Sequence, residues 1–333
     1  MKTLRWGTVG TGGIANAMAG MMKLADNAEL TAVSSRRMAS AQEFADQHEV
    51  PNAFDSWEEM VASESVDAVY VATPTSVREE ICVAAAKNGK HVLGEKPFAS
   101  LPSVRRIVAA CRENNVAFMD GTHFVHHPRT LDIKKHRDDR LGFVWSVASA
   151  FQFNLADRGN IRFNPELEPM GAIGDAGWYN MRAAVEYLPP DVVLDTVSAH
   201  LRRDKETGAA ISGTGVLDFT DGSTSTWNCG FDSGAVVMDL RITGTDGVIN
   251  IDDFLGQNPD GSADFLYRKG GWGDSASDTI NIVSAKPGAA LMFEDMAAAA
   301  DDPSLREQWM VATERTQALL DAAWMAALQQ EKS

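Results

Sequence analysis

The chain has 333 residues, 44% of them hydrophobic and 23% charged, which is ordinary for a globular protein of about two domains. Its 30 basic and 46 acidic side chains give a formal net charge of −16, which repels nucleic acid and anionic membranes and favours small-molecule partners. The three cysteines, Cys82, Cys111 and Cys229, lack the paired spacing of a disulfide framework or a zinc site. With no signal-peptide core in "MKTLRWGTVG" and no run of membrane-spanning length, we expect a cytoplasmic protein.

The first third of the chain alternates short apolar runs with amphipathic helical segments. The runs "LRWGTV", "ELTAVSS", "DAVYVAT", "HVLGE" and "VAFMDG" have the composition of strands. Such alternation is typical of a parallel, doubly wound sheet. We therefore expect an α/β domain over residues 1–122.

The stretch "GTGGIA", residues 10–15, follows the first predicted strand and opens a helical segment. Its G-x-G-x-x-A spacing provides a tight turn, a close approach of the backbone to a pyrophosphate and close helix packing. This context favours a dinucleotide site over a glycine-rich turn without a ligand. The residues predicted to hold the dinucleotide here are Gly10, Thr11, Gly12, Gly13 and Ile14.

The second predicted strand ends in "AVSSRR", where a protein that binds NAD usually places an acid against the ribose hydroxyls. Ser35, Arg36 and Arg37 stand there instead, and their hydroxyl and guanidinium groups suit a 2′-phosphate. NADP is therefore favoured over NAD, with solvated charges at a helix start as the alternative. The missing acid also counts against a methyltransferase that uses S-adenosylmethionine.

The stretch "GEKPF" follows another predicted strand, and ligands of open parallel sheets lie at the carboxyl ends of the strands. Lys96 is therefore expected to face the ligand crevice. Its ammonium could stabilise a carbinol oxygen as it becomes an alkoxide. Simple exposure at the surface is the alternative.

From about residue 143 the pattern changes to strands with a period of two residues. Asp221–Gly222 and Asp246–Gly247 stand between such runs, where hairpin turns require residues that tolerate positive φ. Helices are expected from "GDAGWYNMRAAVEYL" and from the tail. Residues 123–333 should thus form an α+β domain with a large, mostly antiparallel open sheet. The apolar residues expected on one face are Trp227, Cys229 and Phe231 of "STSTWNCGF", and Met238, Leu240 and Ile242 of "VVMDLRIT".

The motifs "GTGGIA", "VATPTS", "GEKP" and "GAIGDAGWYN", in this order and at these separations, resemble the glucose-fructose oxidoreductase, inositol dehydrogenase and rhizopine-catabolism (Gfo/Idh/MocA) family. The resemblance covers nearly the whole chain and is nearest to the dihydrodiol and sugar dehydrogenase branch. It implies an N-terminal Rossmann domain and a C-terminal sheet that often forms an oligomer interface. It also implies hydride transfer between a nicotinamide and a carbinol carbon.

The resemblance also implies a catalytic set of Lys96, Asp175 and Tyr179. Asp175 and Tyr179 are four residues apart, so on one helix they would face the same crevice. Tyr179 would exchange the proton, with its phenol pKa lowered by Lys96, while Asp175 would bind a substrate hydroxyl. The glycines at 171, 174 and 177 would let backbone and substrate approach closely. A helix cap at Asp175 and a packed aromatic at Tyr179 form the alternative interpretation.

Further residues are expected around this set. Arg78 departs from the family, since many relatives carry histidine there, and its contribution is open. A metal site is not expected, because no Cys, Asp or Glu stands at ligand spacing beside the histidines of "THFVHHP". Packing and solvated loop charges are the alternatives for the substrate candidates. The cofactor residues expected in addition are Thr73, Pro74, Thr75, Glu95 and Lys96, and the substrate candidates are His123, His126, Arg158, Arg162 and Trp178.

These expectations describe an NADP-dependent oxidoreductase that acts on the CH–OH group of a sugar, polyol or cyclic diol. One alternative is a redox-neutral glycosidase or lyase that oxidises its substrate transiently with a tightly held cofactor. Another is a sensor that binds NADP(H) and does no chemistry. A homodimer or homotetramer is expected, because an open sheet with an apolar outer face must be covered.

Overall fold

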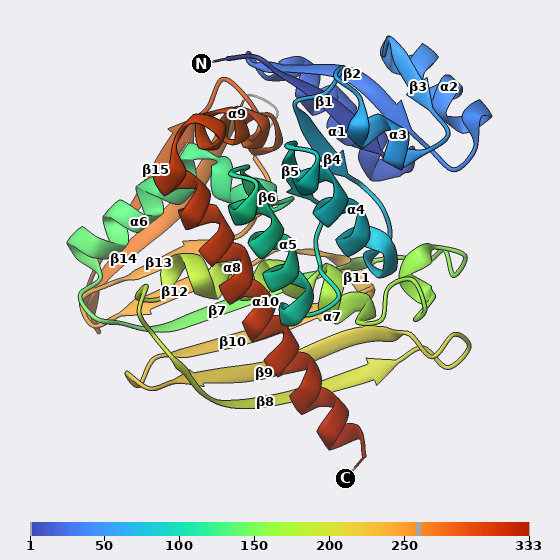
Figure 1. Ribbon diagram of the computed structural model, residues 1–333. Coiled ribbons are helices and arrows are strands. Elements are labelled where there is room, and N and C mark those ends of the chain that lie inside the picture. Colours follow the sequence, from blue (N-terminus) through green and yellow to red (C-terminus); the bar gives the residue numbers. More distant parts are fainter. Residues whose placement is uncertain (1, 258–260, 333) are drawn as a thin grey trace. The chain divides into compact units, whose positions relative to one another are not determined.

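The structure is a computed structural model that describes residues 2–257 and 261–332 (Figure 1). The chain divides into two compact units, of which the first contains Met1–His126 and Lys286–Glu314 and the second contains His127–Ala285 and Arg315–Ser333. Each unit is discontinuous, whereas the sequence led us to expect continuous segments that meet at residue 122. The boundary that the sequence places at residue 122, between a cofactor domain and a substrate domain, stays a prediction.

The first unit contains a parallel sheet that has six strands among the described residues, in the order β3-β2-β1-β4-β5-β6. The order reverses between β1 and β4, so the loops that follow these two strands part at the carboxyl edge and leave room for a ligand. This confirms the Rossmann fold. The sequence missed β3, which is only three residues long and half-buried. The strands are β1 (Leu4–Val9), β2 (Ala28–Ser34), β3 (Asn52–Phe54), β4 (Ala68–Val71), β5 (His91–Gly94) and β6 (Phe118–Asp120).

A helix from the end of the chain completes the core of this first unit. The ring of Phe293, on α9, lies 5.0 Å from the ring of Trp6 and 6.1 Å from that of Tyr70, both edge-on. All three side chains are buried, so the core of the parallel sheet depends on residues far apart in the sequence. The helices here are α1 (Gly13–Leu24), α2 (Met38–His48), α3 (Trp57–Ala62), α4 (Thr75–Lys87), α5 (Leu101–Glu113), the 3-10 helix η1 (His123–His126), α9 (Gly288–Asp301) and the first part of α10 (Pro303–Glu331).

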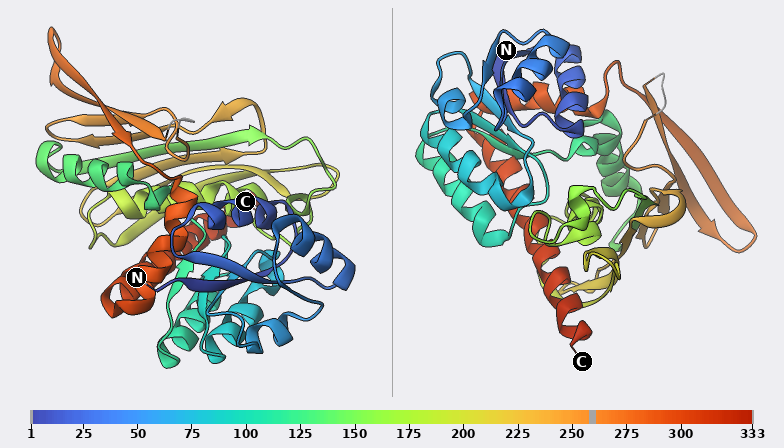
Figure 2. Two further views of the ribbon diagram at one scale, coloured as in Figure 1. Left: turned by 90° about the horizontal axis from the view of Figure 1, so that it is seen from above. Right: turned by 90° about the vertical axis from the view of Figure 1, so that its right-hand side faces the viewer.

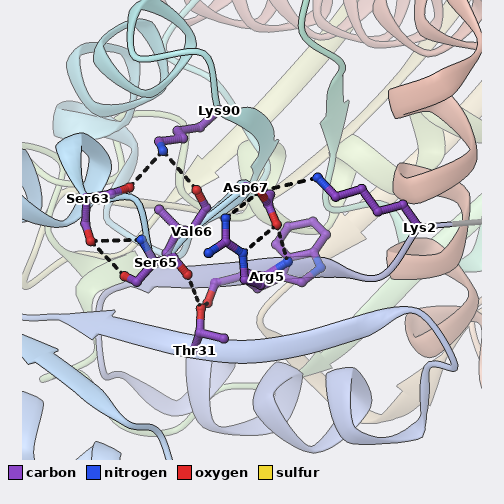
Figure 3. A network of polar contacts seen from close by, with 9 residues as sticks. Lys2, Arg5, Thr31, Ser63, Ser65, Val66, Asp67 and Lys90 are labelled. Carbon is purple, nitrogen blue, oxygen red and sulfur yellow. Dashed lines mark hydrogen bonds and ion pairs between the residues drawn. The ribbon is translucent and has the colours of Figure 1, made fainter.

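Polar contacts fasten the amino edge of the same sheet (Figure 3). Asp67, just before β4, accepts hydrogen bonds from the Arg5 side chain on β1 at 2.9 and 2.8 Å. Lys90 donates to the backbone oxygens of Ser63 and Val66 at 2.8 and 2.9 Å. The hydrogen bonds from Arg5 hold the pKa of Asp67 well below its usual range. The loop between α3 and β4 is therefore fixed far from the carboxyl edge of the sheet.

The second unit contains a sheet with nine strands in the described part of the chain. The order is β15-β14-β13-β12-β7-β10-β9-β8, with β11 also paired to β7, and every ladder is antiparallel except that of β7 with β10. This confirms the open, mostly antiparallel sheet, whose β14–β15 hairpin extends beyond the neighbouring strands (Figure 2). The strands are β7 (Val144–Asn154), β8 (Leu194–Arg203), β9 (Ala210–Phe219), β10 (Thr224–Gly230), β11 (Asp232–Val237), β12 (Leu240–Gly244), β13 (Val248–Ile251), β14 (Ser262–Gly271) and β15 (Asp274–Val283).

The run "VVMDLRIT" forms two strands where one was expected. Leu240 and Ile242 are buried in β12, but Met238 is only half-buried and lies between β11 and β12. The oxygen of Met238 accepts a hydrogen bond from the backbone nitrogen of Phe254, and Met238 bridges to Asp253. These contacts with the segment after β13 interrupt the strand.

Both expected hairpin turns are present, but their glycines serve different purposes. Gly222 joins β9 to β10 with φ +87, as the turn requires. Gly247 joins β12 to β13 and is not left-handed, and a Cβ there would lie 2.7 Å from Cε2 of Tyr267. Close packing, and not positive φ, therefore requires the glycine at 247.

Helices of this unit cover one side of the sheet, and the described residues leave its other side open (Figure 2). They are α6 (Pro128–Arg140), α7 (Gly171–Asp175), α8 (Gly177–Tyr187) and the end of α10. Trp227, Cys229 and Phe231 are buried, as expected. A hollow of about 730 Å³ lies on the sheet, and its lining mixes apolar with polar side chains, of which the exposed ones are polar. They include His200, Thr214, Thr226, Asp239 and Arg241.

A buried ion cluster joins α6 to α8. The Arg182 guanidinium lies 2.7 Å from the Glu186 carboxylate, which also pairs with Lys134. Burial alone would raise the pKa of Glu186, but these two cations outweigh burial and lower it to about 2. Glu186 is therefore ionised at neutral pH, and its charge fixes the end of α8.

Candidate active site

The glycine turn between β1 and α1 has the geometry of an anion site. Gly10 has φ +107, and a Cβ there would lie 2.7 Å from the Ala72 oxygen, so only glycine fits. A Cβ at Gly12 or Gly13 would meet no protein atom within 4 Å. No side chain caps α1, and its first turn carries no acid. The open space and the free helix amides therefore suit a phosphate group.

A pocket of about 440 Å³ lies at the end of β2. It is lined by Thr11, Ser35, Arg36, Arg37 and Ser40, so its described lining contains no acid. Two guanidinium groups and the adjacent hydroxyls suit a dianionic phosphate. Ser40 was missed by the sequence analysis because it lies three residues beyond the "SSRR" stretch, in the first turn of α2.

The segment after β5 carries Lys96, which is half-buried. The preceding Glu95 is buried and accepts a hydrogen bond from the Tyr70 hydroxyl at 2.6 Å and from the Lys96 backbone nitrogen at 3.3 Å. A Cβ at Gly121 would lie 2.8 Å from Oε1 of Glu95, so the residue after β6 must be glycine. Glu95 thus holds the backbone that bears Lys96.

Arg78, the residue that departs from the family pattern, is only 3% exposed. Its guanidinium donates to the backbone oxygens of Thr73 and Pro97, and to Oγ1 of Thr75 at 3.2 Å. Arg78 therefore clamps the loop after β4 to the loop that follows Lys96. The structure gives this side chain a positioning role at the carboxyl edge of the sheet.

The two histidines of η1 differ in their surroundings. Burial, with smaller contributions from Lys96 and His126, lowers the pKa of His123 to about 4, so this ring is neutral near Lys96. The Nδ1 atom of His126 lies 2.6 Å from Oδ2 of Asp295, and its ring stacks on Trp309 at 4.6 Å. The contacts of His126 are therefore with α9 and α10 inside the first unit.

In the second unit, Asp175 forms a bidentate pair with Arg162. The Nε atom of Arg162 lies 2.7 Å from Oδ2 of Asp175, and Nη2 lies 3.2 Å from Oδ1. Tyr179 is 8% exposed, and its ring lies edge-on to Phe151 at 5.4 Å. The expectation of one helix is wrong, because α7 ends at Asp175 and α8 begins at Gly177. Asp175 therefore ends one helix while Tyr179 lies in the first turn of the next.

The glycines around Asp175 approach protein atoms. Gly171 has φ +49, and a Cβ there would lie 2.3 Å from the Ala210 oxygen on β9. A Cβ at Gly177 would contact Sγ of Cys229 at 3.4 Å. Close packing on β9 therefore explains the glycine at 171 without any substrate, whereas the contact at 177 is an ordinary one that does not require glycine.

The remaining substrate candidates have structural partners. The Nε atom of Arg158 lies 3.0 Å from Oδ2 of Asp204, and its guanidinium lies over Phe163 at 4.4 Å. Trp178 is 0% exposed and belongs to the core of the second unit. The described residues contain no group of three His, Cys, Asp or Glu side chains that could hold a metal ion.

Each unit thus gathers part of the expected site. The glycine turn, the pocket of Ser35 to Arg37, the Thr73–Thr75 loop and Lys96 all lie at the carboxyl edge of the parallel sheet. Asp175, Arg162 and Tyr179 lie together near α7 and α8 of the second unit. This arrangement provides open backbone amides, two guanidinium groups and an ammonium in the first unit, and a carboxylate, its guanidinium partner and a phenol in the second.

Comparison with known proteins agrees with this description. Residues 4–122 match the family model described as an oxidoreductase family with an NAD-binding Rossmann fold, and residues 134–250 match a GFO/IDH/MocA C-terminal domain. The chain is 31% identical over 271 residues to D-xylose 1-dehydrogenase (NADP(+)) 2 of Haloferax volcanii, covering 80% of this chain and 82% of that protein. It is 30% identical over 310 residues to scyllo-inositol 2-dehydrogenase (NADP(+)) of Bacillus subtilis, covering 87% and 86%.

A solved structure gives the same fold. It is that of a 3-ketoreductase from Actinomadura kijaniata in complex with NADP and TDP-benzene, with a TM-score of 0.87, 24% identity and 98% of each chain covered. The match extends over both units. On the family models and the curated relatives together, this chain belongs to the GFO/IDH/MocA family of oxidoreductases.

Proposed function

We propose that the chain is an NADP(H)-dependent oxidoreductase that interconverts a secondary alcohol and a ketone, or a lactol and a lactone, on a sugar, polyol or cyclic diol. The observation that carries this proposal is the uncapped glycine turn beside a pocket with two arginines and no acid. The names of the relatives from Haloferax volcanii and Bacillus subtilis support NADP and sugar-like substrates.

The groups of the first unit fit the cofactor. The open space over Gly12 and Gly13 would receive the pyrophosphate, and Ser35, Arg36 and Arg37 would receive the 2′-phosphate. The loop of Thr73, Pro74 and Thr75 would lie along the dinucleotide. When bound, the nicotinamide supplies or accepts the hydride.

We assign stabilisation of the developing charge to Lys96 and exchange of the hydroxyl proton of the substrate to Tyr179. The Lys96 ammonium would stabilise the substrate oxygen as negative charge develops on it, and the Tyr179 phenol would exchange the proton. Asp175 would accept a hydrogen bond from a substrate hydroxyl, with its carboxylate oriented by Arg162. His123, neutral because of its low pKa, is a further hydrogen-bonding candidate near Lys96. His126, Arg158 and Trp178 have no part in this proposal because of the contacts and burial described above.

The first test is a fluorescence titration with NADPH and NADH, followed by a screen of sugars and polyols for a change in cofactor absorbance. The 8 tryptophans provide the signal. We expect tighter binding of NADPH and turnover on one sugar class. Lys96→Met and Tyr179→Phe should each lower kcat by roughly a hundredfold or more. Turnover of the double variant at the wild-type rate would refute the assignment.

The same assay distinguishes the other functions. A redox-neutral glycosidase or lyase would consume substrate without net NADPH, which product analysis would reveal. A sensor would bind cofactor tightly and exchange no hydride with any carbohydrate. Either result would contradict the proposed dehydrogenase.

We also propose a homodimer or homotetramer that forms through the open side of the nine-stranded sheet described above. The hollow on this side offers both Arg241 and Asp239 for paired contacts with a second copy. Analytical ultracentrifugation tests this, and a monomer at micromolar concentration would contradict it.

The net charge of −16 supports the absence of nucleic-acid and membrane partners, and the free cysteines support a cytoplasmic location. No helix among the described residues is long and apolar enough to cross a membrane.

A further inference from the structure

A side-chain pair behind the glycine turn has no part in the function described so far. Asn16, in the first turn of α1, donates from Nδ2 to the backbone oxygens of Thr11 at 3.1 Å and Gly12 at 3.0 Å. Its Oδ1 atom lies 2.8 Å from Nε2 of His48, the last residue of α2. The amide of Asn16 thus connects the cofactor turn to a second helix.

The chemistry of these partners fixes the orientation of the amide. Backbone carbonyl oxygens only accept hydrogen bonds, so the group that faces Thr11 and Gly12 must be the NH₂. Oδ1 then faces His48 and can only accept. His48 must therefore carry a proton on Nε2.

The environment of His48 favours the neutral ring, which carries a single proton. Its ring is half-buried and lies against Phe44, with ring centroids 4.4 Å apart. Burial, with a smaller contribution from the charge of Lys23, lowers the pKa of His48 below its ordinary value. At neutral pH the ring is neutral, and the bond to Asn16 selects its Nε2–H tautomer.

The orientation of the two backbone oxygens bound by Asn16 affects how the glycine turn can bind an anion. The oxygens of Thr11 and Gly12 belong to the same turn as the amides that face a bound pyrophosphate, and a peptide that rotated would present an oxygen to that anion. The Asn16 side-chain amide holds the Thr11 oxygen on the side away from the phosphates, and it shares the Gly12 oxygen with the backbone nitrogen of Asn16, which donates to it at 3.0 Å. Because α2 also begins at the pocket of Arg37 and Ser40, one helix supports both phosphate-binding regions.

We infer that Asn16 and His48 are positioning residues for cofactor binding, which orient the glycine turn toward the pyrophosphate. This inference rests on the proposed binding of NADP(H). The pyrophosphate is common to NADPH and NADH. The pair should therefore affect the two cofactors equally, whereas Arg36 and Arg37 should affect NADPH alone.

The test measures Kd for NADPH and NADH by fluorescence for Asn16→Ala, His48→Ala and His48→Gln in the full chain. We expect Asn16→Ala and His48→Ala to raise both Kd values on the order of three- to tenfold, the effect of one or two hydrogen bonds. His48→Gln restores an N–H donor and should recover most of the affinity. A role in stability alone would leave both Kd values unchanged in the folded variants.

Asn114→Ala is the matched control, because Asn114 donates to the Ala110 oxygen at 2.8 Å in α5 and is absent from the cofactor pocket. It should lower stability by a similar amount and leave both Kd values unchanged. Unchanged Kd in Asn16→Ala, or equal loss in His48→Gln and His48→Ala, would overturn the inference. Ring ¹⁵N chemical shifts of the wild-type protein give a test without substitution, and an Nδ1–H tautomer of His48 would overturn it as well.

If the wild-type chain binds neither NADPH nor NADH, the proposed function itself fails. If the wild-type chain binds cofactor and the variants bind it equally well, only the inference about Asn16 and His48 fails. The two failures are therefore distinguishable.

Discussion

The same residue type meets different requirements at three positions of this chain. Gly10 is needed for its positive φ and its contact with the Ala72 oxygen, and Gly171 for its approach to β9. A Cβ at Gly12 would have no protein neighbour within 4 Å, so the fold places no demand on this glycine. A glycine that the fold does not require is a candidate for contact with a ligand.

Gly12→Ala should leave the thermal midpoint near the wild-type value and weaken NADPH binding, because the added methyl occupies the space over the turn. Gly10→Ala should lower stability by about 1–2 kcal/mol or more, because alanine is strained at positive φ. Thermal unfolding and cofactor titration of both variants check this. An equal loss of stability in the two variants would contradict the conclusion that the fold requires glycine at 10 and not at 12.

Asp67→Asn should lower the free energy of unfolding at pH 7 by roughly 1 kcal/mol, since it removes a carboxylate that accepts from a partly exposed arginine. The pKa of Asp67 is lower in the folded chain than in the unfolded chain. The carboxylate therefore stabilises the fold above its unfolded pKa, and this contribution is lost as pH falls toward its folded pKa. Urea unfolding at several pH values should show the variant and wild type converging below about pH 4. A constant difference down to pH 2 would contradict the assignment.

At the scale of elements, two loops of the first unit share one buried guanidinium. Arg78 begins on α4 and reaches the oxygens of Thr73 and Pro97. These loops carry residues proposed to contact the cofactor and the substrate. The Thr75 hydroxyl also donates to the Pro97 oxygen at 3.3 Å, but Arg78 is the side chain that contacts both loops with a charged group.

Arg78→Lys should lower kcat by roughly tenfold or more, because an ammonium cannot make the forked contacts that orient both loops. Kd for NADPH should rise by a smaller factor than kcat falls, since the substitution leaves the glycine turn unchanged. Steady-state kinetics with the identified substrate checks this. Wild-type kcat in the variant would show that the clamp is dispensable.

The sequence predicted helices and strands best where a periodic pattern extends over many residues and where the turns contain glycine. The parallel strands, the glycine turn and the Gly222 hairpin followed from such patterns. The strand β3 and the break at Ala176 between α7 and α8 did not, because three residues show no period and Ala176 itself keeps helical φ and ψ. The partners of Arg78, His126 and Arg158 are also contacts at long range or in loops, which no local pattern encodes.

At the scale of the whole molecule, the first unit is built from two segments that lie far apart in the sequence. Residues 286–314 return to it, and Phe293 packs against Trp6 and Tyr70 in its core. The pattern of the first third predicted the sheet but gave no sign of this return. Folding of the cofactor unit therefore requires that most of the chain be synthesised.

A chain that ends at residue 285 should fail to form a cooperative cofactor unit, because the buried face of Trp6 would be exposed to water. Near-UV circular dichroism and NADPH titration of this truncated chain check the expectation. Residues 1–126 alone should fail for the same reason. NADPH binding by either fragment with wild-type affinity would contradict it.

The uncapped start of α1 has a consequence for the lifetime of the protein. With no side chain bonded to its first amides, this helix relies on water there until a phosphate arrives. A dinucleotide bound there, as proposed above, would act as the missing cap, and its binding free energy would add to that of folding. Resistance to proteolysis should rise with the free concentration of cofactor relative to its Kd, so the enzyme would persist in cells rich in NADP(H) and be degraded in cells that lack it.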